Sequence, residues 1–242
     1  MPSSSKWLRR LLSGLSMFLA FGVGAGDENR FQSLFDGQTL AEWEGSAELW
    51  RVRDRTIVGG TLQAPMPDDE FLCTRQGFGD FELRLEARMS GGQAGGVSFR
   101  AQRVPDSTRV GGYQADMGFI PGKFMPIVSD LTDVDPDEPY PLWGSLLDEY
   151  RPETSRYPNP NAPYRLIAVA ARAVIDDVLR PGDWNDVTVL AMGDHVEIGL
   201  NGTKTVEHTE RGDVPRVGFI CLQVHSGPPS EAYYRNIRIR QR

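Results

Sequence analysis

Cysteine is scarce in this chain of 242 residues, which contains two, Cys73 and Cys221. Two cysteines far apart in a chain of this size do not make a disulfide framework, and the sequence does not show whether their Cα atoms approach each other. The composition therefore leaves this one pairing open, and it favours two free thiols over a bridge.

Positive charge is in deficit. The 26 lysines and arginines are outnumbered by 33 aspartates and glutamates, which gives a formal net charge of −7. The phosphates of nucleic acid require a basic surface on their partner. We therefore expect no nucleic-acid partner.

Long hydrophobic runs are absent beyond the N-terminus. There Lys6, Arg9 and Arg10 precede an apolar stretch, residues 11–23, and small residues follow to position 25, as in a cleaved secretory signal peptide. The stretch is too short for a comfortable transmembrane helix, so we expect no stable membrane insertion after cleavage. No cysteine stands at the cleavage site to carry a lipid. Residues 1–25 are thus a predicted signal peptide, and the protein is expected to be exported, to the periplasm or outside the cell.

The remaining residues, 26–242, read as one all-β domain without a repeat. The clearest strand is 81–89, where apolar and charged residues alternate, as expected for a half-buried strand of an antiparallel sheet. Asn201 and Gly202 form the strongest short hairpin signal. Apolar residues at helical spacing predict one short helix over 164–178.

The stretch 111–118 places an amide and a carboxylate together. Read as a strand, it puts Gln114 and Asp116 on one face and Tyr113 on the other, because strand side chains alternate. A solvated strand face carries polar residues too, so this pattern alone does not indicate a site.

Two further strands repeat the polar pattern. In 95–100 Arg100 lies on the polar side, and if the strands are neighbours its guanidinium faces Asp116, as a binding group or as a structural partner. In the strand near the C-terminus Gln223 and His225 share a face. Imidazole titrates near neutral pH and serves as base, acid or metal ligand.

A long segment of proline, glycine and acidic residues, 120–142, interrupts the strands. Such loops in compact domains are usually functional or disordered. Asp148 and Glu149 follow it, and a straight strand aims only one of two adjacent side chains inward. The sequence does not decide which of these two acids faces the expected groove.

Nine segments, in this order, resemble successive motifs of the 3-keto-disaccharide hydrolase family and span nearly the whole mature chain. They are residues 34–43, 79–86, 96–100, 112–116, 143–149, 181–185, 200–202, 222–227 and 234–239. The resemblance implies a concanavalin-like jelly-roll β-sandwich of two antiparallel sheets, with long loops around a concave face that holds a carbohydrate. It also implies cleavage of glycosides oxidised at C3 of the sugar.

The chemistry implied by such a substrate differs from glycoside hydrolysis by two carboxylates. A ketone at C3 acidifies the hydrogen on C2, so a base can remove it, the aglycone can leave from C1, and water can add to the enone. This route requires a base, stabilisation of an enolate and a proton donor for the leaving group.

The resemblance and the polar strand faces together predict the site. His225 is expected to act as base or metal ligand, and Asp116 and Glu149 as acid, base or ligands. A divalent ion held by these three side chains would serve as enolate stabiliser, although no ligand spacing indicates one, and no other cofactor is expected. The residues expected to bind substrate are Arg100, Gln114, Gln223, Asp148, Trp143 and Tyr113.

Other functions stay open at this point. A non-catalytic, lectin-like carbohydrate-binding module can use the same sandwich, because fold does not settle function. A structural role in a larger exported assembly is a further alternative. A conventional endoglucanase is disfavoured, because the carboxylates Glu82 and Glu86 share a face with Arg84 between them, which would suppress a raised acid pKa. The sequence gives neither the sugar nor the linkage.

Overall fold

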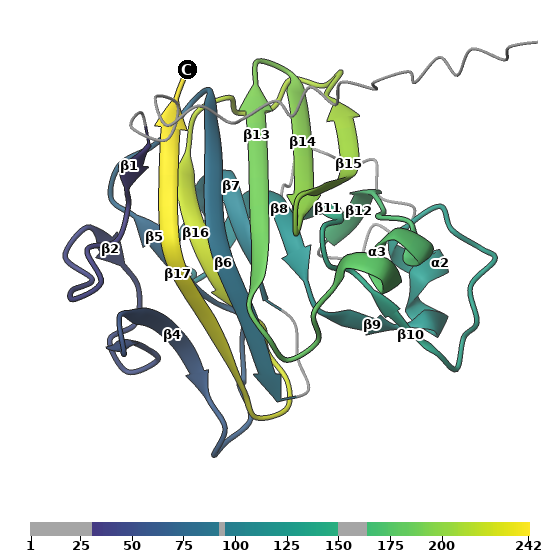
Figure 1. The fold of residues 1–242 in the computed structure, drawn as a ribbon, viewed down its shortest axis with the longest axis horizontal. Coiled ribbons are helices and arrows are strands. Elements are labelled where there is room, and N and C mark those ends of the chain that lie inside the picture. The colour runs from purple at the N-terminus through teal and green to yellow at the C-terminus, as the bar shows by residue number, and fades with distance from the viewer. Residues whose placement is uncertain (1–30, 92–94, 150–163) are drawn as a thin grey trace, which may run out of the picture. The chain divides into compact units, whose positions relative to one another are not determined.

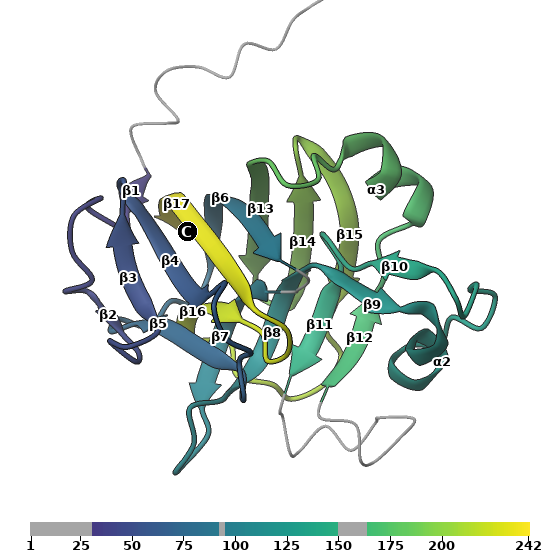
Figure 2. The same cartoon turned by 90° about the horizontal axis from the view of Figure 1, so that it is seen from below.

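The protein is seen here in a computed structural model, which describes residues 31–91, 95–149 and 164–242. Two antiparallel sheets pack against each other in this part of the chain (Figures 1 and 2). The predicted all-β sandwich of two antiparallel sheets is therefore confirmed. The predicted signal peptide, residues 1–25, lies outside the described residues and stays a prediction.

The first sheet, called sheet A, has eight strands. In spatial order they are β15 (Thr203–Thr209), β14 (His195–Leu200), β13 (Asn185–Met192), β6 (Phe81–Gly91), β17 (Ser230–Gln241), β4 (Thr56–Thr61) and β3 (Trp50–Arg53), with β1 (Gln32–Ser33) paired to β17.

The second sheet, called sheet B, has seven strands and carries the polar strands singled out by the sequence. In spatial order they are β12 (Tyr164–Ala168), β11 (Leu146–Glu149), β8 (Val110–Met117), β7 (Gly95–Arg103), β16 (Phe219–Val224), β5 (Glu70–Thr74) and β2 (Trp43–Glu44).

Alternation of side chains fixes which face of each sheet is buried. In β6 Phe81, Leu83 and Leu85 are buried in the main core cluster, which also contains Phe99 and Leu222 of sheet B. Each such side chain contributes roughly 1.5–3 kcal/mol when fully buried. The core thus lies between the sheets, and the opposite face of sheet B is left to carry polar groups.

The hairpin predicted at Asn201 and Gly202 is confirmed. Both residues have positive φ, 49° and 84°, and they join β14 to β15 with Leu200 opposite Thr203. Positive φ at both central positions is the mark of the two-residue turn that matches the twist of the flanking strands.

The helix predicted over 164–178 is wrong in its first half. Tyr164–Ala168 is the strand β12, whose Leu166 lies opposite Leu147 of β11, and only Arg172–Val178 is helical, as α3. The apolar residues of a strand and of a separate helix happened to follow one helical spacing. Residues 164–168 form a strand because they pair with β11 at the edge of sheet B, and the local spacing of apolar residues does not reveal such pairing.

The segment 120–142 contains secondary structure of its own. It holds the β-hairpin of β9 (Phe119–Pro121) and β10 (Pro139–Pro141), the 3₁₀ turn η1 (Gly122–Phe124) and the short helix α2 (Met125–Val128). These elements lie at one side of the two sheets, near α3 (Figure 1).

Cys73 and Cys221 form a disulfide, so the preference for two free thiols is wrong. The two residues lie directly opposite each other in β5 and β16, with their Cα atoms 4.0 Å apart. Strands that are distant in the sequence become neighbours through the sheet order, which cysteine spacing cannot show. Within the described residues no helix combines the length and apolar character needed to cross a bilayer.

Candidate functional site

Polar side chains from three adjacent strands meet on the outer face of sheet B. Gly96 lies opposite both Asp116 and Gln223, and Ser98 lies opposite Gln114. Residues opposite each other in an antiparallel pair project from the same face. The structure therefore brings together the amides and the carboxylate that the alternation placed on one side.

A chain of buried hydrogen bonds fixes these amides. Ser98 Oγ donates to Gln114 Oε1 (2.7 Å), Gln114 Nε2 donates to Gln223 Oε1 (2.9 Å), and Gln223 Nε2 donates to Glu149 Oε1 (3.2 Å). Gly96 makes room for the chain, because a Cβ atom there would lie 2.5 Å from Gln114 Cδ. Glu149 is thus held in place by an amide relay across β8, β16 and β11.

A cavity of about 220 Å³ lies above this face. The segment between β8 and β11 and the strand β12 border it, so the long segment flanks the polar face as expected. Its lining residues are Gln114, Asp116, Phe119, Ile120, Pro121, Phe124, Leu142, Leu147, Glu149, Tyr164 and His225.

Asp116 and Glu149 are buried acids, 6% and 3% exposed. One oxygen of each, Asp116 Oδ1 and Glu149 Oε2, has no hydrogen-bond partner among the described residues. Burial raises the pKa of Asp116 to about 7, although the charge of His225 opposes it. Burial, and then the charges of Asp69 and Asp116, raise the pKa of Glu149 well above its usual value. Both acids can therefore hold a proton near neutral pH.

His225 follows β16 and presents its ring to the cavity. Its Nδ1 lies 2.7 Å from the carbonyl oxygen of Ser226. A carbonyl only accepts, so we assign the ring proton to Nδ1, which leaves Nε2 of the neutral ring as a proton acceptor. His225 can therefore act as a base.

Asp69 is a site residue that the sequence analysis missed. It immediately precedes β5 and is buried; its Oδ1 accepts a hydrogen bond from Ser226 N (2.7 Å) and lies 3.6 Å from His225 Nδ1. The sequence shows only an acidic run before a strand. The pairing of β5 with β16 is what places Asp69 beside His225.

Tyr164 was also missed, because it fell inside the predicted helix. It lines the cavity, and burial, followed by the charges of Asp116 and Glu149, raises its pKa to about 12. The hydroxyl therefore stays protonated and can donate a hydrogen bond to a ligand.

The structure decides which of the two adjacent acids of β11 faces the cavity. Glu149 lies opposite Gly112 and joins the cavity, whereas Asp148 lies opposite Tyr113 and projects from the other face. The predicted role of Asp148 in the groove therefore has no support from its position.

Arg100 does not face Asp116, so that expectation is wrong. An extra residue between Phe99 and Gln102 bulges β7, and Arg100 has a φ of 50°. The bulge reverses the alternation. The fully buried guanidinium donates instead to the carbonyls of Gly79 and Gly193 and to Asp80.

Tyr113 and Trp143, predicted to bind substrate, also lie outside the cavity. Tyr113 is in the core between the sheets, and its hydroxyl donates to Glu210 Oε2 (2.5 Å). Trp143 packs in the same core and borders a different cleft. Tyr113 and Gln114 are adjacent in β8, so strand alternation alone places their side chains on opposite faces of the sheet.

The side chains proposed as metal ligands do not form a metal-like group as they lie. Among the described residues, one group of three has ligand atoms all within 4.8 Å of one another, and His225, Asp116 and Glu149 are not that group. The reaction that we propose for this site therefore uses the protein side chains and no metal ion.

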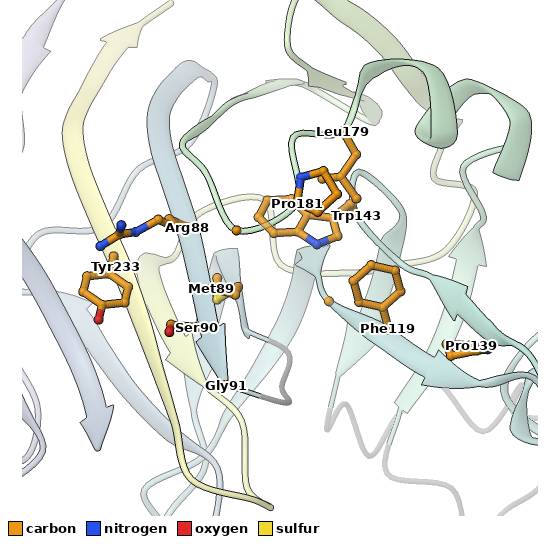
Figure 3. A pocket seen from close by; sticks show the side chains of 12 residues that line it. Arg88, Met89, Ser90, Gly91, Phe119, Pro139, Trp143, Leu179, Pro181 and Tyr233 are labelled. Atoms are coloured by element: carbon orange, nitrogen blue, oxygen red, sulfur yellow. The ribbon is translucent and has the colours of Figure 1, made fainter. Parts of the chain in front are cut away.

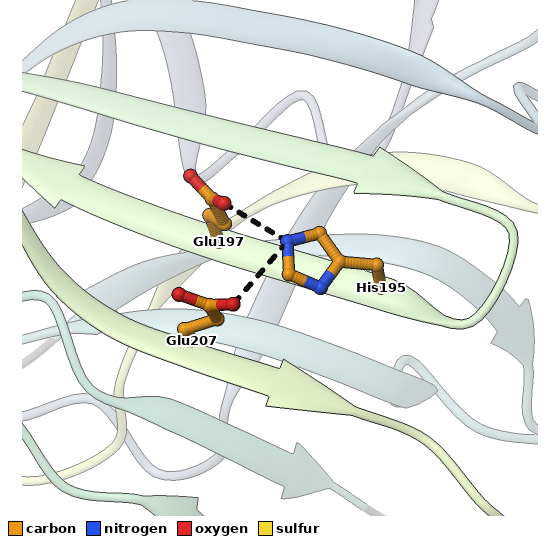
Figure 4. Close-up of side chains that lie close together, drawn as sticks. All are labelled: His195, Glu197 and Glu207. Atoms are coloured by element: carbon orange, nitrogen blue, oxygen red, sulfur yellow. Dashed lines mark hydrogen bonds and ion pairs between the residues drawn. The ribbon is translucent and has the colours of Figure 1, made fainter.

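The group that meets this distance is His195, Glu197 and Glu207 on β14 and β15 (Figure 4). Its carboxylates are already paired with a cation: Lys204 Nζ contacts Glu207 and lies 3.7 Å from Glu197 Oε1. We interpret this cluster as an ion-pair network on the outer face of sheet A.

Comparison with known proteins places the fold. Residues 30–240 match the family model described as a 3-keto-alpha-glucoside-1,2-lyase-like domain. No curated protein sequence matches the chain. Among solved structures, one from Parabacteroides distasonis named "putative glycosyl hydrolase" is 18% identical, with a TM-score of 0.59 over 89% of this chain and 95% of that one.

Two other structures share the architecture. The carbohydrate-binding module CBM66 from Bacillus subtilis is 16% identical, with a TM-score of 0.54 over 83% of this chain and 96% of that one. A β-glucanase from Bacillus licheniformis is 10% identical, with a TM-score of 0.51 over 88% and 97%. At these identities the likeness establishes the jelly-roll fold alone.

Proposed function

The chain belongs to the 3-keto-alpha-glucoside-1,2-lyase-like family, and from this premise we propose that it cleaves glycosides whose sugar carries a ketone at C3. One observation carries the proposal. A histidine whose Nδ1 lies 2.7 Å from the carbonyl oxygen of Ser226 borders the same cavity as two buried carboxyl groups whose pKa values are raised. The cavity thus supplies a base and two acids, the set that elimination from a 3-keto sugar requires.

The proposed reaction begins with removal of the C2 proton. His225 Nε2 takes this proton, and the electron pair moves into an enolate delocalised onto the C3 oxygen. Asp69 lies close enough to stabilise the imidazolium that forms, and the Ser226 carbonyl keeps the ring oriented. The arrangement is a histidine base held by a carboxylate, with the proton stored on the ring.

The two acids take different roles in the proposal. Glu149, kept protonated and held by Gln223, donates a hydrogen bond to the C3 oxygen as negative charge develops there. Asp116 protonates the glycosidic oxygen as the C1–O bond breaks and the C1–C2 double bond forms. Asp116 is given this role because, among the cavity residues of β8, it lies nearest in the chain to Phe119.

Water then completes hydrolysis. Its oxygen adds to C1 of the enone while Asp116, now a carboxylate, takes a proton from the water, and C2 regains a proton from the imidazolium of His225. Both the acid and the base are restored, and the two products are the aglycone alcohol and a 3-keto sugar. If water does not add, the enone itself is released and the reaction is a lyase reaction.

The experiment is incubation of the purified chain with 3-keto-trehalose or a 3-keto-glucoside, following release of the aglycone and ultraviolet absorption of the enone. Three variants, His225→Gln, Asp116→Asn and Glu149→Gln, each keep the side-chain size and are expected to lower kcat by about 10²–10⁴-fold. His195→Gln, a substitution on sheet A, serves as the matched control and should retain wild-type turnover. No cleavage by the wild-type chain, with or without added divalent metal, would refute the proposal.

The same experiment separates an enzyme from a lectin. Binding of an intact glycan without turnover, unchanged by His225→Ala, would establish the non-catalytic alternative. Loss of turnover with retained binding in the same variant supports the catalytic role of His225.

We also propose that the chain is exported after cleavage behind residue 25. The disulfide between Cys73 and Cys221 supports an oxidising compartment. Mass spectrometry of the protein recovered from the periplasm and medium of an expressing bacterium tests this. A full-length cytoplasmic product would contradict it.

A further inference from the structure

A second and larger cleft has a volume of about 700 Å³, and Figure 3 shows the side chains that line it. We call it the side cleft. Strands β6 and β17, the β8–β9 and β10–β11 connections and the loop after α3 enclose it. Its lining residues are Arg88, Met89, Ser90, Gly91, Gly118, Phe119, Pro139, Trp143, Leu179, Pro181, Gly182 and Tyr233.

The side cleft and the site cavity share a wall. Phe119 lines both and is 51% exposed. The site cavity is smaller than the roughly 300–1,000 Å³ of ordinary ligand pockets, whereas the side cleft is within that range. A ligand whose reacting ring fills the site cavity therefore has room for its other half in the side cleft.

The side cleft has the composition of a sugar site. Phe119, Trp143 and Tyr233 contribute aromatic rings, which pack against the apolar faces of sugar rings, and Ser90 adds a hydroxyl. Figure 3 shows Arg88 and Tyr233 at one end and Trp143, Leu179 and Phe119 at the other. A ligand lying between the ends meets rings on one side and a cation on the other.

Arg88 is held by rings. Its guanidinium lies 4.3 Å from the ring centroid of Tyr233 and 5.2 Å from that of Trp184. Its Nε is buried and has no hydrogen-bond partner among the described residues. An atom this buried is out of reach of a ligand, so recognition of an anion would fall to the two terminal nitrogens of the guanidinium.

Neighbouring arginines on the same face already have carboxylate partners. Arg51 and Arg53 share Glu231, and Arg235 pairs with Glu86 (2.6 Å). Arg88 makes no such pair within the described ranges. Its charge is therefore available to an anion, and a planar guanidinium binds carboxylate or sulfate oxygens with two donors.

We infer that the side cleft binds the leaving half of the substrate, and that this half is a sugar carrying an anionic group recognised by Arg88. The inference rests on the proposed function for the direction of the substrate, with the oxidised ring in the site cavity. The anionic group is a carboxylate, as in a uronic acid, or a sulfate. Selectivity for charged over neutral leaving groups follows.

The test is calorimetric binding of three disaccharides to the full chain. The probes are maltose and two analogues in which C6 of the reducing ring carries a carboxylate or a sulfate. None has a 3-keto group, so turnover does not interfere. We expect at least one charged analogue to bind at least tenfold more tightly than maltose at low salt, and the tighter of the two identifies the anion.

Variants test which residue causes the preference for a charged analogue over maltose. Arg88→Gln is expected to abolish it, while Arg235→Gln, whose arginine already has a carboxylate partner, should keep it. Phe119→Ala changes an exposed side chain and should weaken all three probes by a similar factor while the preference remains. Equal affinity for the three probes, no binding of any of them, or a preference that survives Arg88→Gln would overturn the inference.

Failure of the proposed function has a different signature. Cleavage of 3-keto methyl α-glucoside by the unmodified chain tests that function alone, because the methyl leaving group does not reach the side cleft. A chain that prefers charged disaccharides through Arg88 but leaves this glucoside intact retains the binding site and loses the enzymatic proposal. Cleavage of the glucoside without any charge preference upholds the enzymatic proposal and overturns the anion site.

Discussion

Asp69 and His225 meet across β5 and β16, with 3.6 Å between Asp69 Oδ1 and His225 Nδ1. The backbone of Ser226 ties both: its N–H donates to Asp69 and its carbonyl accepts from the imidazole. The carboxylate is therefore positioned to stabilise the ring when it carries a second proton. Asp69 thus helps to orient the base, His225, without itself contacting the substrate.

Asp69→Asn is the first test of this arrangement. Asparagine keeps an oxygen for Ser226 N–H but removes the charge, so we expect kcat to fall by about 10–100-fold with KM changed less than twofold. The charge of Asp69 raises the pKa values of Asp116 and Glu149, so both pKa values fall in the variant. A reaction that needs these acids protonated must then lose activity at a lower pH than wild type.

The measurement is the pH profile of kcat/KM between pH 5 and 9. Asp68→Asn is the matched control: Asp68 adjoins Asp69, and its side chain is 66% exposed. Wild-type kcat and an unmoved alkaline limb in Asp69→Asn would show that Asp69 has no positioning role.

Asp116→Asn should stabilise the protein at high pH while it destroys activity. Burial raises the pKa of Asp116 from 3.8 to about 7, so the folded state binds a proton that the unfolded state releases. The free energy of unfolding therefore falls as pH rises from about 4 to 7, by at most on the order of 4 kcal/mol, and the loss is complete above pH 7. Asparagine cannot ionise and escapes this loss.

Denaturant unfolding at pH 5 and pH 8 measures the effect. The stability difference between the two pH values should shrink in Asp116→Asn and stay as in wild type in Asp106→Asn, whose side chain is exposed. An undiminished pH dependence in Asp116→Asn would mean that burial does not penalise its charge.

Strand alternation predicted most of the residues that form the site. It placed Gln114, Asp116, Gln223 and His225 on one side of sheet B, since period two is a property of the strand itself. It failed at Arg100, where a single bulged residue reverses the period and leaves no signature in composition.

Pairs that depend on strand order were not accessible in the same way. Cys73 with Cys221, and Asp69 with His225, meet only because β5 lies beside β16. Neither strand's own sequence specifies which strand lies beside it. The sequence pattern can therefore point to the individual residues but not to the contacts between them.

The disulfide predicts a large stability effect. It closes a long loop, with Cys73 and Cys221 separated by 148 positions, and so restricts the unfolded chain. Replacing both cysteines with alanine should lower the free energy of unfolding by about 2–5 kcal/mol. Urea unfolding of the double variant, and of wild type with and without reductant, checks this; equal midpoints for all three would contradict it.

Gly96→Ala tests the amide relay. A Cβ at Gly96 would lie 2.5 Å from Gln114 Cδ, so Gln114 must move and its bond to Gln223 breaks. Glu149 then loses its fixed orientation, and we expect kcat/KM to fall by about tenfold, the equivalent of one weakened hydrogen bond of about 1.4 kcal/mol. Gly77→Ala, where the nearest atom is 3.5 Å away, is the matched control. A wild-type kcat/KM in Gly96→Ala would refute the relay.

Arg100→Met separates structure from catalysis at the residue that the sequence assigned to the site. The guanidinium is 0% exposed and makes three hydrogen bonds, to two carbonyls and to Asp80. Its removal leaves these acceptors without their donor, so the free energy of unfolding should fall by about 3 kcal/mol. Below the melting temperature of the variant, KM and kcat should equal those of wild type, because no bond of Arg100 reaches the cavity. A raised KM at unchanged stability would instead return Arg100 to the sugar site and would require the bulge in β7 to relax when substrate binds.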